Sequence, residues 1–247
     1  MNNLLEIVRR LYPNLKNLNE TTILSKENEV LGYSATLYND DNFAISGGTN
    51  TNKETARRIA VAEALERGFV RKISKDPIIS EQFLLNQIPS SLGFACGFER
   101  EKTKLRSFCE GLEKWTLSQI IDFNFPATIQ SKFKLTKLAE NLCIQFDNIQ
   151  LFQKKISVNL PEATTNTSLV FSLFIGYTKT GAFPGSCIAF ENEDQMTHAC
   201  IEAHRNFSNY NYLIKKNIAP ENLILKRILF FGENKKLVGN QINTYEN

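Results

Sequence analysis

The stretch "GGTNTNKETARRIAVAEALER", Gly47–Arg67, joins a glycine turn to a helix that carries glutamates beside its apolar side. Upstream, two β-leaning runs separated by "NDDN" predict a hairpin within Val30–Gly48. Downstream, the apolar spacing predicts one long helix over Lys53–Ile73. A hairpin, a glycine turn and an amphipathic helix therefore form the first recognisable unit of the fold.

The glycine turn followed by a helix returns twice along the chain. The small-residue stretch Ile88–Gly97 precedes a helix predicted over Glu99–Phe123, and Gly181–Phe190 precedes one predicted over Glu191–Lys216. Strands that alternate with helices predict an α/β or α+β fold, and the lack of a Pro-, Gly- or Ser-rich linker predicts one domain over 1–247. The other predicted elements are a helix at Leu4–Tyr12, a helix at Ser131–Phe146, strands at Asn148–Leu160 and Ser168–Thr178, and an element at Asn222–Gly232 that fits a strand or a short helix.

Two of these helices place glutamate pairs at the border of their apolar faces. Glu63 and Glu66 flank Leu65, and Arg67 follows directly; Glu110, Glu113 and Lys114 repeat this order around Leu112. Carboxylates this close repel each other and are costly to bury unless cations neutralise them. Solvated helix decoration and a Mg²⁺ site both remain open, because Mg²⁺ accepts a few carboxylates together with phosphate oxygens. The predicted apolar faces are Ile59, Ala62, Leu65 and Phe69 in the first helix, and Leu105, Phe108, Leu112 and Trp115 in the second.

The composition excludes several classes of protein. A formal charge of +3 with scattered Lys and Arg does not favour nucleic-acid binding. The start of the sequence has no long apolar run behind its charges, and the longest apolar stretch, Ser168–Tyr177, is too short to span a membrane. We therefore expect a soluble, cytoplasmic protein without nucleic-acid or membrane partners.

Cysteine and histidine patterns offer weaker alternatives. Five cysteines, odd in number and without a CxxC pair, favour reduced thiols over disulfides or a zinc site. Cys109 and Cys200 near the glutamates fit small buried filler better than nucleophiles. His198 and Glu202, at i,i+4, form at most half of a transition-metal site. The run "SGGTNTNKE" lacks the GK[ST] ending of a phosphate-binding P-loop.

Three segments together resemble the ATP-site segments of YcaO-domain proteins. They are "GGTNTNKETARRIAVAEALER", "SSLGFACG" with "RSFCEGLEK", and "GSCIAFENEDQMTHACIEAHR". The family pattern is a glycine turn leading to ExxER, S-x-N-G-x-A-x-G leading to a second ExxER, and a glycine stretch leading to an E-A-x-Q helix. The resemblance covers about 47–207, and the matching residues are Glu63, Glu66, Arg67, Ser90, Gly93, Ala95, Gly97, Glu110, Glu113, Glu202 and Ala203.

The resemblance implies a YcaO-like α/β (α+β) fold, with mixed sheets and helices around a nucleotide site, and ATP and Mg²⁺ as cofactors. Members of the family use ATP to activate a peptide amide oxygen, which leads to azolines or thioamides. We therefore expect a peptide or protein substrate, a partner protein that presents it, and a homodimer as an open option. By resemblance, Mg²⁺ would be held by Glu63, Glu66, Glu110, Glu113 and Glu202, and the phosphates by Arg67, Lys114, Arg205 and Ser90.

Departures from the family pattern put turnover in question. Ile59 stands where a serine is typical, Leu92 where an asparagine is typical, Lys114 for an arginine and Arg205 for a glutamine. The segment 217–247 also lacks the family's proline-rich ending. An enzyme is favoured, and no catalytic residue can be named. The alternatives are a catalytically degenerate scaffold or nucleotide-binding accessory protein, and a structural homologue whose acidic helices bind nothing.

Overall fold

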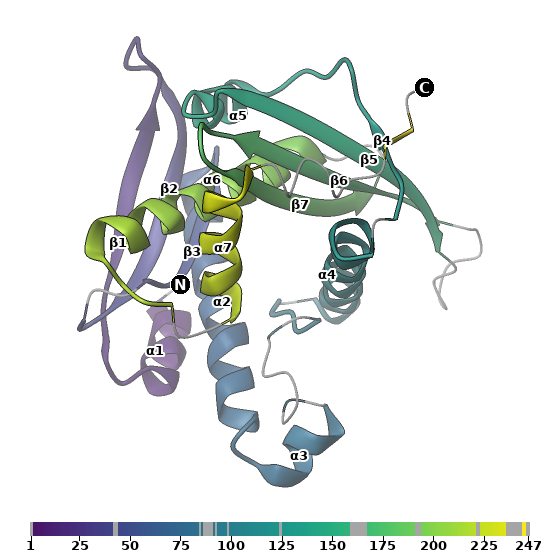
Figure 1. Ribbon diagram of the computed structural model, residues 1–247. Coiled ribbons are helices and arrows are strands. Elements are labelled where there is room, and N and C mark those ends of the chain that lie inside the picture. Colours follow the sequence, from purple (N-terminus) through teal and green to yellow (C-terminus); the bar gives the residue numbers. More distant parts are fainter. Residues whose placement is uncertain are drawn as a thin grey trace. The chain divides into compact units, whose positions relative to one another are not determined.

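The computed structural model describes residues 2–41, 44–83, 85, 91, 93–97, 99–123, 125–158, 167–190, 194–220, 223–235 and 244–245. These residues form helices and two sheets, which confirms the predicted α+β class (Figure 1). The chain divides into two compact units, Met1–Gly111 and Leu112–Asn247. This division does not test whether the chain is one domain, which stays a prediction.

The first unit is built on a three-stranded antiparallel sheet in the order β1-β2-β3 (Figure 1). Strands β2 and β3 form the predicted hairpin. The sequence analysis missed β1, which is a polar edge strand held to helix α2 by an ion pair between Glu20 and Arg57. The elements of this unit are α1 (Asn2–Leu11), β1 (Leu15–Leu24), β2 (Val30–Asn39), β3 (Ala44–Asn50), α2 (Lys53–Ile73) and α3 (Pro77–Gln82), followed by the start of α4 (Arg100–Ile121).

Helix α2 packs on β2 and β3 through its smallest side chains. A Cβ atom added to Gly48 on β3 would collide with the Ala56 carbonyl oxygen and would lie 2.8 Å from the Ala60 amide nitrogen. Because the strand backbone approaches the helix so closely, only glycine and alanine fit at this contact. The predicted apolar face of α2 was therefore wrong in part: Phe69 is 53% exposed, and the buried line contains Ala56, Ala60 and Ala64 instead.

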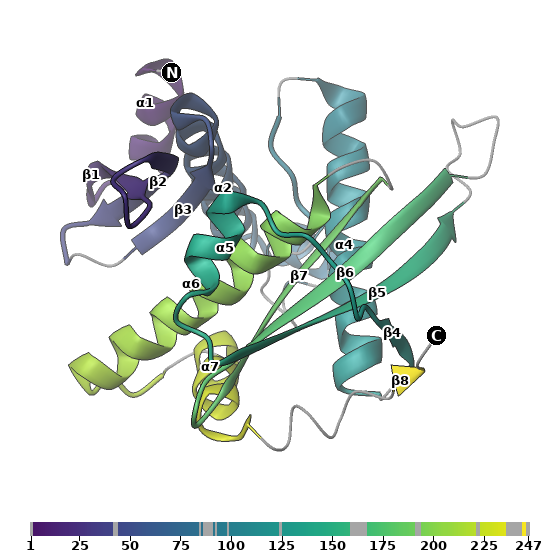
Figure 2. The ribbon, with the colours of Figure 1, turned by 90° about the horizontal axis from the view of Figure 1, so that it is seen from above.

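The second unit is built on a five-stranded sheet in the order β7-β6-β5-β4-β8, antiparallel except for the parallel pair β4–β8. Strand β6 lies between β7 and β5 and contributes Phe171 and Phe174 to the core. Figure 2 shows α6 lying along this sheet. The helix packs on β6 and β7 and also contacts α5 and α7. The elements are β4 (Ala127–Ile129), α5 (Lys137–Cys143), β5 (Asn148–Val158), β6 (Thr167–Tyr177), β7 (Ala182–Phe190), α6 (Gln195–Lys216), α7 (Leu223–Glu233) and β8 (Thr244–Tyr245).

The contact between β7 and α6 repeats the contact between β3 and α2. A Cβ atom on Gly185 would collide with the Ala199 carbonyl oxygen and the Ala203 amide nitrogen. Each unit therefore places three antiparallel strands before a helix, with a strand glycine packed on an Ala-x-x-x-Ala segment of that helix. The close approach fixes where on the helix each later side chain emerges.

Helix α4 shows a second difference from the predicted apolar faces. Trp115 is 60% exposed and Phe108 is also exposed, whereas Thr116, Ile120 and Ile121 are buried. Helix α7 resolves the open assignment of Asn222–Gly232 in favour of a helix, over Leu223–Glu233. None of the helices within the described ranges is both long and apolar enough to cross a membrane.

Candidate nucleotide site

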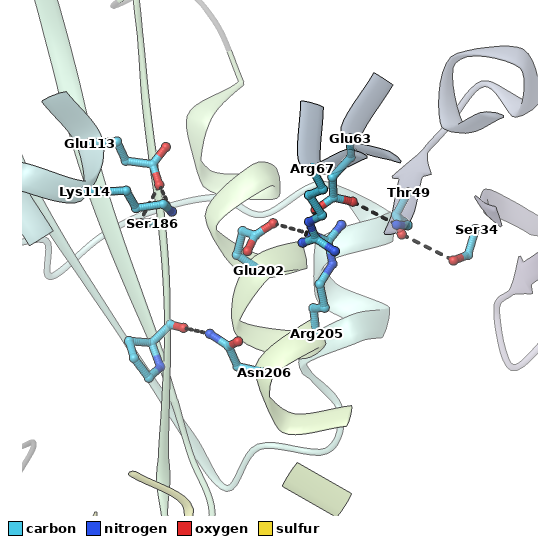
Figure 3. A network of polar contacts seen from close by, with 12 residues as sticks. Ser34, Thr49, Glu63, Arg67, Glu113, Lys114, Ser186, Glu202, Arg205 and Asn206 are labelled. Atoms are coloured by element: carbon cyan, nitrogen blue, oxygen red, sulfur yellow. Dashed lines mark hydrogen bonds and ion pairs between the residues drawn. The ribbon is translucent and has the colours of Figure 1, made fainter. Parts of the chain in front are cut away.

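Glu63 and Arg67 form a pair on α2 that faces the edge strand β3 (Figure 3). The Glu63 Oε1 atom accepts a hydrogen bond from Arg67 Nη2 at 2.6 Å, and Oε2 accepts the Gly47 amide at 2.8 Å. Arg67 Nη1 donates to the Ile45 carbonyl oxygen at 2.6 Å. The pair thus satisfies backbone groups of β3 that would otherwise lie at an open sheet edge, so it has a structural role as well as the charge expected of a nucleotide site.

Glu66 is the most deeply buried of the predicted acids, with a side chain only 6% exposed. Its Oε1 atom accepts the Cys96 amide at 2.8 Å and Arg106 Nη2 at 2.9 Å. Burial raises the pKa of Glu66 above its ordinary value, and the Arg106 charge and the Cys96 amide partly oppose this rise. Sequence reasoning missed Arg106, although it lies one helical turn before Glu110 and thus on the acidic side of α4.

The glycine-containing segment before α4 is held from two sides. The Ser107 hydroxyl on α4 donates to the Gly93 carbonyl oxygen, and Glu66 on α2 binds the Cys96 amide. Gly93 has a φ of +76°, a left-handed conformation that glycine adopts at low cost. The predicted phosphate ligand Ser90 and the unusual Leu92 lie outside the described residues, so Ser90 stays a prediction.

Glu113 on α4 meets strand β7 within the second unit (Figure 3). Its Oε1 atom accepts Lys114 Nζ at 2.6 Å and the hydroxyl of the buried Ser186 at 2.7 Å, and its side chain is 13% exposed. Ser186 follows Gly185 and was not found from the sequence; a polar residue directly after the strand glycine was the available signal. Glu110 lies one turn earlier on α4 and is half-buried.

Glu202 and Arg205 pair on α6 at 2.8 Å and are both about one-third exposed. The next residue, Asn206, donates its side-chain amide to the Pro184 carbonyl oxygen at 2.7 Å (Figure 3). Pro184 precedes Gly185 as Gly47 precedes Gly48, and Asn206 follows the second alanine of its contact by three residues, as Glu63 does. Asn206 is therefore the structural counterpart of Glu63.

This register changes the meaning of the sequence repeat. Since Ala203 corresponds to Ala60, Glu202 corresponds to Ile59 and not to Glu63. The segments "AEALER" and "CIEAHR" look alike in sequence but present their acids at different places on their helices. Glu202 is thus a feature of α6 that has no counterpart at the same position of α2. The neighbouring His204 has a pKa that is lowered by burial and by the Arg205 charge.

The described residues do not contain a ready-made metal cluster. Among them, no three His, Cys, Asp or Glu side chains gather closely enough to hold a metal ion. A surface hollow of about 390 Å³ on β4 and β5, lined by residues such as Gln153 and Lys154, includes none of the predicted site residues. Four of the candidate acids each pair with a Lys or Arg side chain instead: Glu63, Glu66, Glu113 and Glu202.

The donor set nevertheless fits a magnesium–nucleotide complex in its chemistry. Carboxylate oxygens are ligands that Mg²⁺ accepts, and Lys and Arg are the side chains that bind phosphates. The site residues named from the sequence therefore stay predictions with suitable chemistry.

Comparison with solved structures finds a similar fold in YcaO from Methanopyrus kandleri, a structure bound with AMPPCP and Mg²⁺. The TM-score is 0.54 and the identity 12%, over 98% of this chain and 76% of that chain. No protein-family model and no curated protein matches the sequence. The similarity shows a shared fold, which confirms the YcaO-like architecture expected from the three segments.

Proposed function

We propose that the chain binds ATP with Mg²⁺ and uses the nucleotide to activate a backbone amide of a peptide or protein. The observation that carries the proposal is the pairing of four predicted acids, Glu63, Glu66, Glu113 and Glu202, each with a Lys or Arg at 2.6–2.9 Å. These pairs lie on helices of a YcaO-like fold, and the similar solved structure was bound with an ATP analogue and Mg²⁺.

The residues have distinct roles in this proposal. Glu63, Glu66, Glu110, Glu113 and Glu202 would hold the metal, directly or through water, and Arg67, Lys114, Arg205 and Ser90 would hold the phosphates. When bound, Mg²⁺ neutralises the charge that collects on phosphate oxygens during phosphoryl transfer. The chain itself would bind and orient the nucleotide and the amide, because this chemistry depends mainly on positioning and electrostatics.

A second candidate is nucleotide binding without turnover. Ile59 favours it, because this half-buried side chain packs beside β3: its Cβ lies 2.8 Å from the place of a Gly48 Cβ. Where the family pattern has the hydroxyl of a serine, this chain therefore has the apolar side chain of Ile59. Lys114 also replaces the planar fork of an arginine by a single ammonium group on Glu113.

Calorimetry with AMPPCP, with and without Mg²⁺, tests binding. We expect Mg²⁺-dependent binding that weakens about tenfold or more in Glu63→Gln of the first unit and in Glu113→Gln of the second. Glutamine keeps a hydrogen-bond acceptor for the Gly47 amide and the Ser186 hydroxyl, so the fold should persist. Glu101→Gln, on the exposed start of α4 beside Lys104, is the matched control. Absence of binding would exclude both candidate functions.

Turnover separates the two candidates once binding is established. The protein would be incubated with ATP, Mg²⁺ and mixed peptides that contain Cys, Ser and Thr. The release of phosphate and the masses of the peptides would then be measured. Phosphate release together with the loss of one water from a peptide supports the enzyme. Binding without either signal, also after addition of proteins co-purified from a cytoplasmic extract as presenting partners, supports the accessory role.

A further inference from the structure

Two cysteine side chains from different helices meet in the second unit. Cys143 is the last residue of α5 and is half-buried, whereas Cys200 lies in the second turn of α6 and is fully buried. Their sulfur atoms are 3.1 Å apart. A disulfide bond is about 2 Å long, so the formation of a bond between these sulfurs needs a shift of only about 1 Å.

The surrounding contacts hold the two helices in this register. The N-cap residue of α5, Thr136, shares a hydrogen bond with Thr197 of α6 at 2.7 Å between their hydroxyl oxygens. The Cys200 thiol also contacts the Ala139 carbonyl oxygen at 3.5 Å. Thr197 and Cys200 are separated by three residues and so lie on one side of α6. The two helices are thus fixed to each other at both ends of α5.

We propose that Cys143 and Cys200 are a site of oxidative modification, at which a peroxide converts the two thiols into a disulfide that joins α5 to α6. In the first step the Cys143 sulfur attacks a peroxide oxygen, the O–O bond breaks, and a sulfenic acid and water (for hydrogen peroxide) form. In the second step the Cys200 sulfur displaces water from the sulfenic acid. Two thiols and one hydrogen peroxide give one disulfide and two waters.

The order of these steps follows from the exposure of the two sulfur atoms. Cys143 is the more accessible sulfur, so it meets the oxidant first. Cys200 is fully buried, so its sulfur does not meet the oxidant directly and reacts by attack on the sulfenic acid formed at Cys143, whose sulfur lies 3.1 Å away. The disulfide would form on the side of α6 opposite to Glu202, which follows Cys200 by two residues on the same helix.

Peptide mapping under non-reducing conditions tests this inference. Reduced protein is treated with dilute hydrogen peroxide, digested and analysed by mass spectrometry. We expect one cross-linked peptide pair that contains Cys143 and Cys200 and disappears with a reductant. We also expect the oxidised protein to melt about 5–10 °C higher, because the bond closes a long loop in the unfolded chain.

Three variants sharpen the result. Cys143→Ser, at the half-buried position, should remove both the cross-linked pair and the rise in melting temperature, and Cys200→Ala should do the same. Cys187→Ser, in the same unit, should leave both intact. A wild-type protein that forms a different disulfide or only sulfinic acid at these positions overturns the inference, as does an unchanged rise in Cys143→Ser. The readouts do not involve nucleotide, so they are independent of the proposed function.

Discussion

At the scale of single residues, Glu66 combines burial with charge. Its carboxylate has little contact with water and depends on Arg106 and the Cys96 amide. Burial raises its pKa in the folded protein above the ordinary value of 4.5. In the pH window just above 4.5 the native state therefore binds more protons than the unfolded state. The contribution of Glu66 to stability consequently falls as pH rises through the folded pKa.

Two substitutions separate the charge of Glu66 from its hydrogen bonds. Glu66→Gln keeps an acceptor, and we expect the stability difference between wild type and this variant to shrink as pH rises from about 4.5 to neutrality. Glu66→Ala leaves the Cys96 amide without its acceptor and should cost about 1–3 kcal/mol at pH 7. Urea unfolding at several pH values measures both effects. Equal losses in the two variants would argue that neither hydrogen bond contributes.

His204 on α6 titrates in the opposite sense. Burial, and then the charge of Arg205, lower its pKa below the ordinary value of 6.5, so the unfolded state binds more protons just below this pH. We expect stability to be lost as pH falls below about 6.5, and His204→Gln to flatten this dependence. Thermal melts between about pH 7.5 and 5.5 measure it. The same substitution at the exposed His198 of α6 controls for the introduction of a glutamine, and an unchanged slope in His204→Gln would contradict the prediction.

The sequence could reveal the acids but only some of their partners. Arg67, Lys114 and Arg205 follow their glutamates within one helical turn, so spacing alone finds these pairs. Arg106 and Ser186 reach Glu66 and Glu113 from other elements, and a local pattern contains no information about such contacts.

At the scale of elements, the close contacts at Gly48 and Gly185 determine how two helices sit on their strands. An added methyl group would meet helix backbone, which cannot move aside as a flexible side chain can. Gly111, in the middle of α4, differs because no atom from another part of the chain lies within 4 Å of the place that a Cβ atom would occupy. Substitution by alanine should therefore change the stability of the protein in one direction at Gly48 and Gly185 and in the opposite direction at Gly111.

Alanine substitution tests this contrast. We expect Gly48→Ala and Gly185→Ala to destabilise the protein by about 3 kcal/mol or more, since the clash requires a backbone shift. Gly111→Ala should stabilise it by about 0.5–1 kcal/mol, because glycine is unfavourable inside a helix. Urea denaturation of the three variants gives the comparison. A destabilising Gly111→Ala would mean that this position has a contact or a role beyond helix propensity.

Elements whose apolar residues recur at a regular spacing could be predicted from the sequence. Strands that form only because they pair with a neighbouring strand could not. The hairpin of β2 and β3 and the helices α2, α4 and α6 follow from apolar spacing. Strand β1 has polar residues on both faces, and β4 has only three residues, so each depends on a neighbouring strand. The apolar face of α2 was misjudged at Phe69 because the close approach of β3 selects small side chains over large ones.

At the scale of the whole molecule, the predicted acids are divided between the two compact units, with Glu63, Glu66 and Glu110 in the first and Glu113 and Glu202 in the second. A ligand that binds only the native protein stabilises it in proportion to the logarithm of its concentration. Nucleotide binding should therefore be visible in unfolding of the full chain.

Thermal unfolding with AMPPCP and Mg²⁺ measures this linkage. At a nucleotide concentration about 100 times the Kd, we expect a stabilisation of about 2.7 kcal/mol and a rise of about 5–10 °C in the melting temperature. Chelation of Mg²⁺ should abolish the rise, and Glu113→Gln should require more nucleotide for the same effect. A rise that is equal with and without Mg²⁺ would contradict a metal-dependent site.

The paired glycine contacts also have an evolutionary consequence. Gly48, Ala56 and Ala60, and likewise Gly185, Ala199 and Ala203, leave no room for a larger side chain, whereas most surface positions can drift freely. At the 12% identity that separates this chain from the YcaO of Methanopyrus kandleri, we expect such positions to change most slowly. A search that requires a strand glycine followed by Ala-x-x-x-Ala, twice in one chain, should therefore recover distant members of this fold that overall similarity misses.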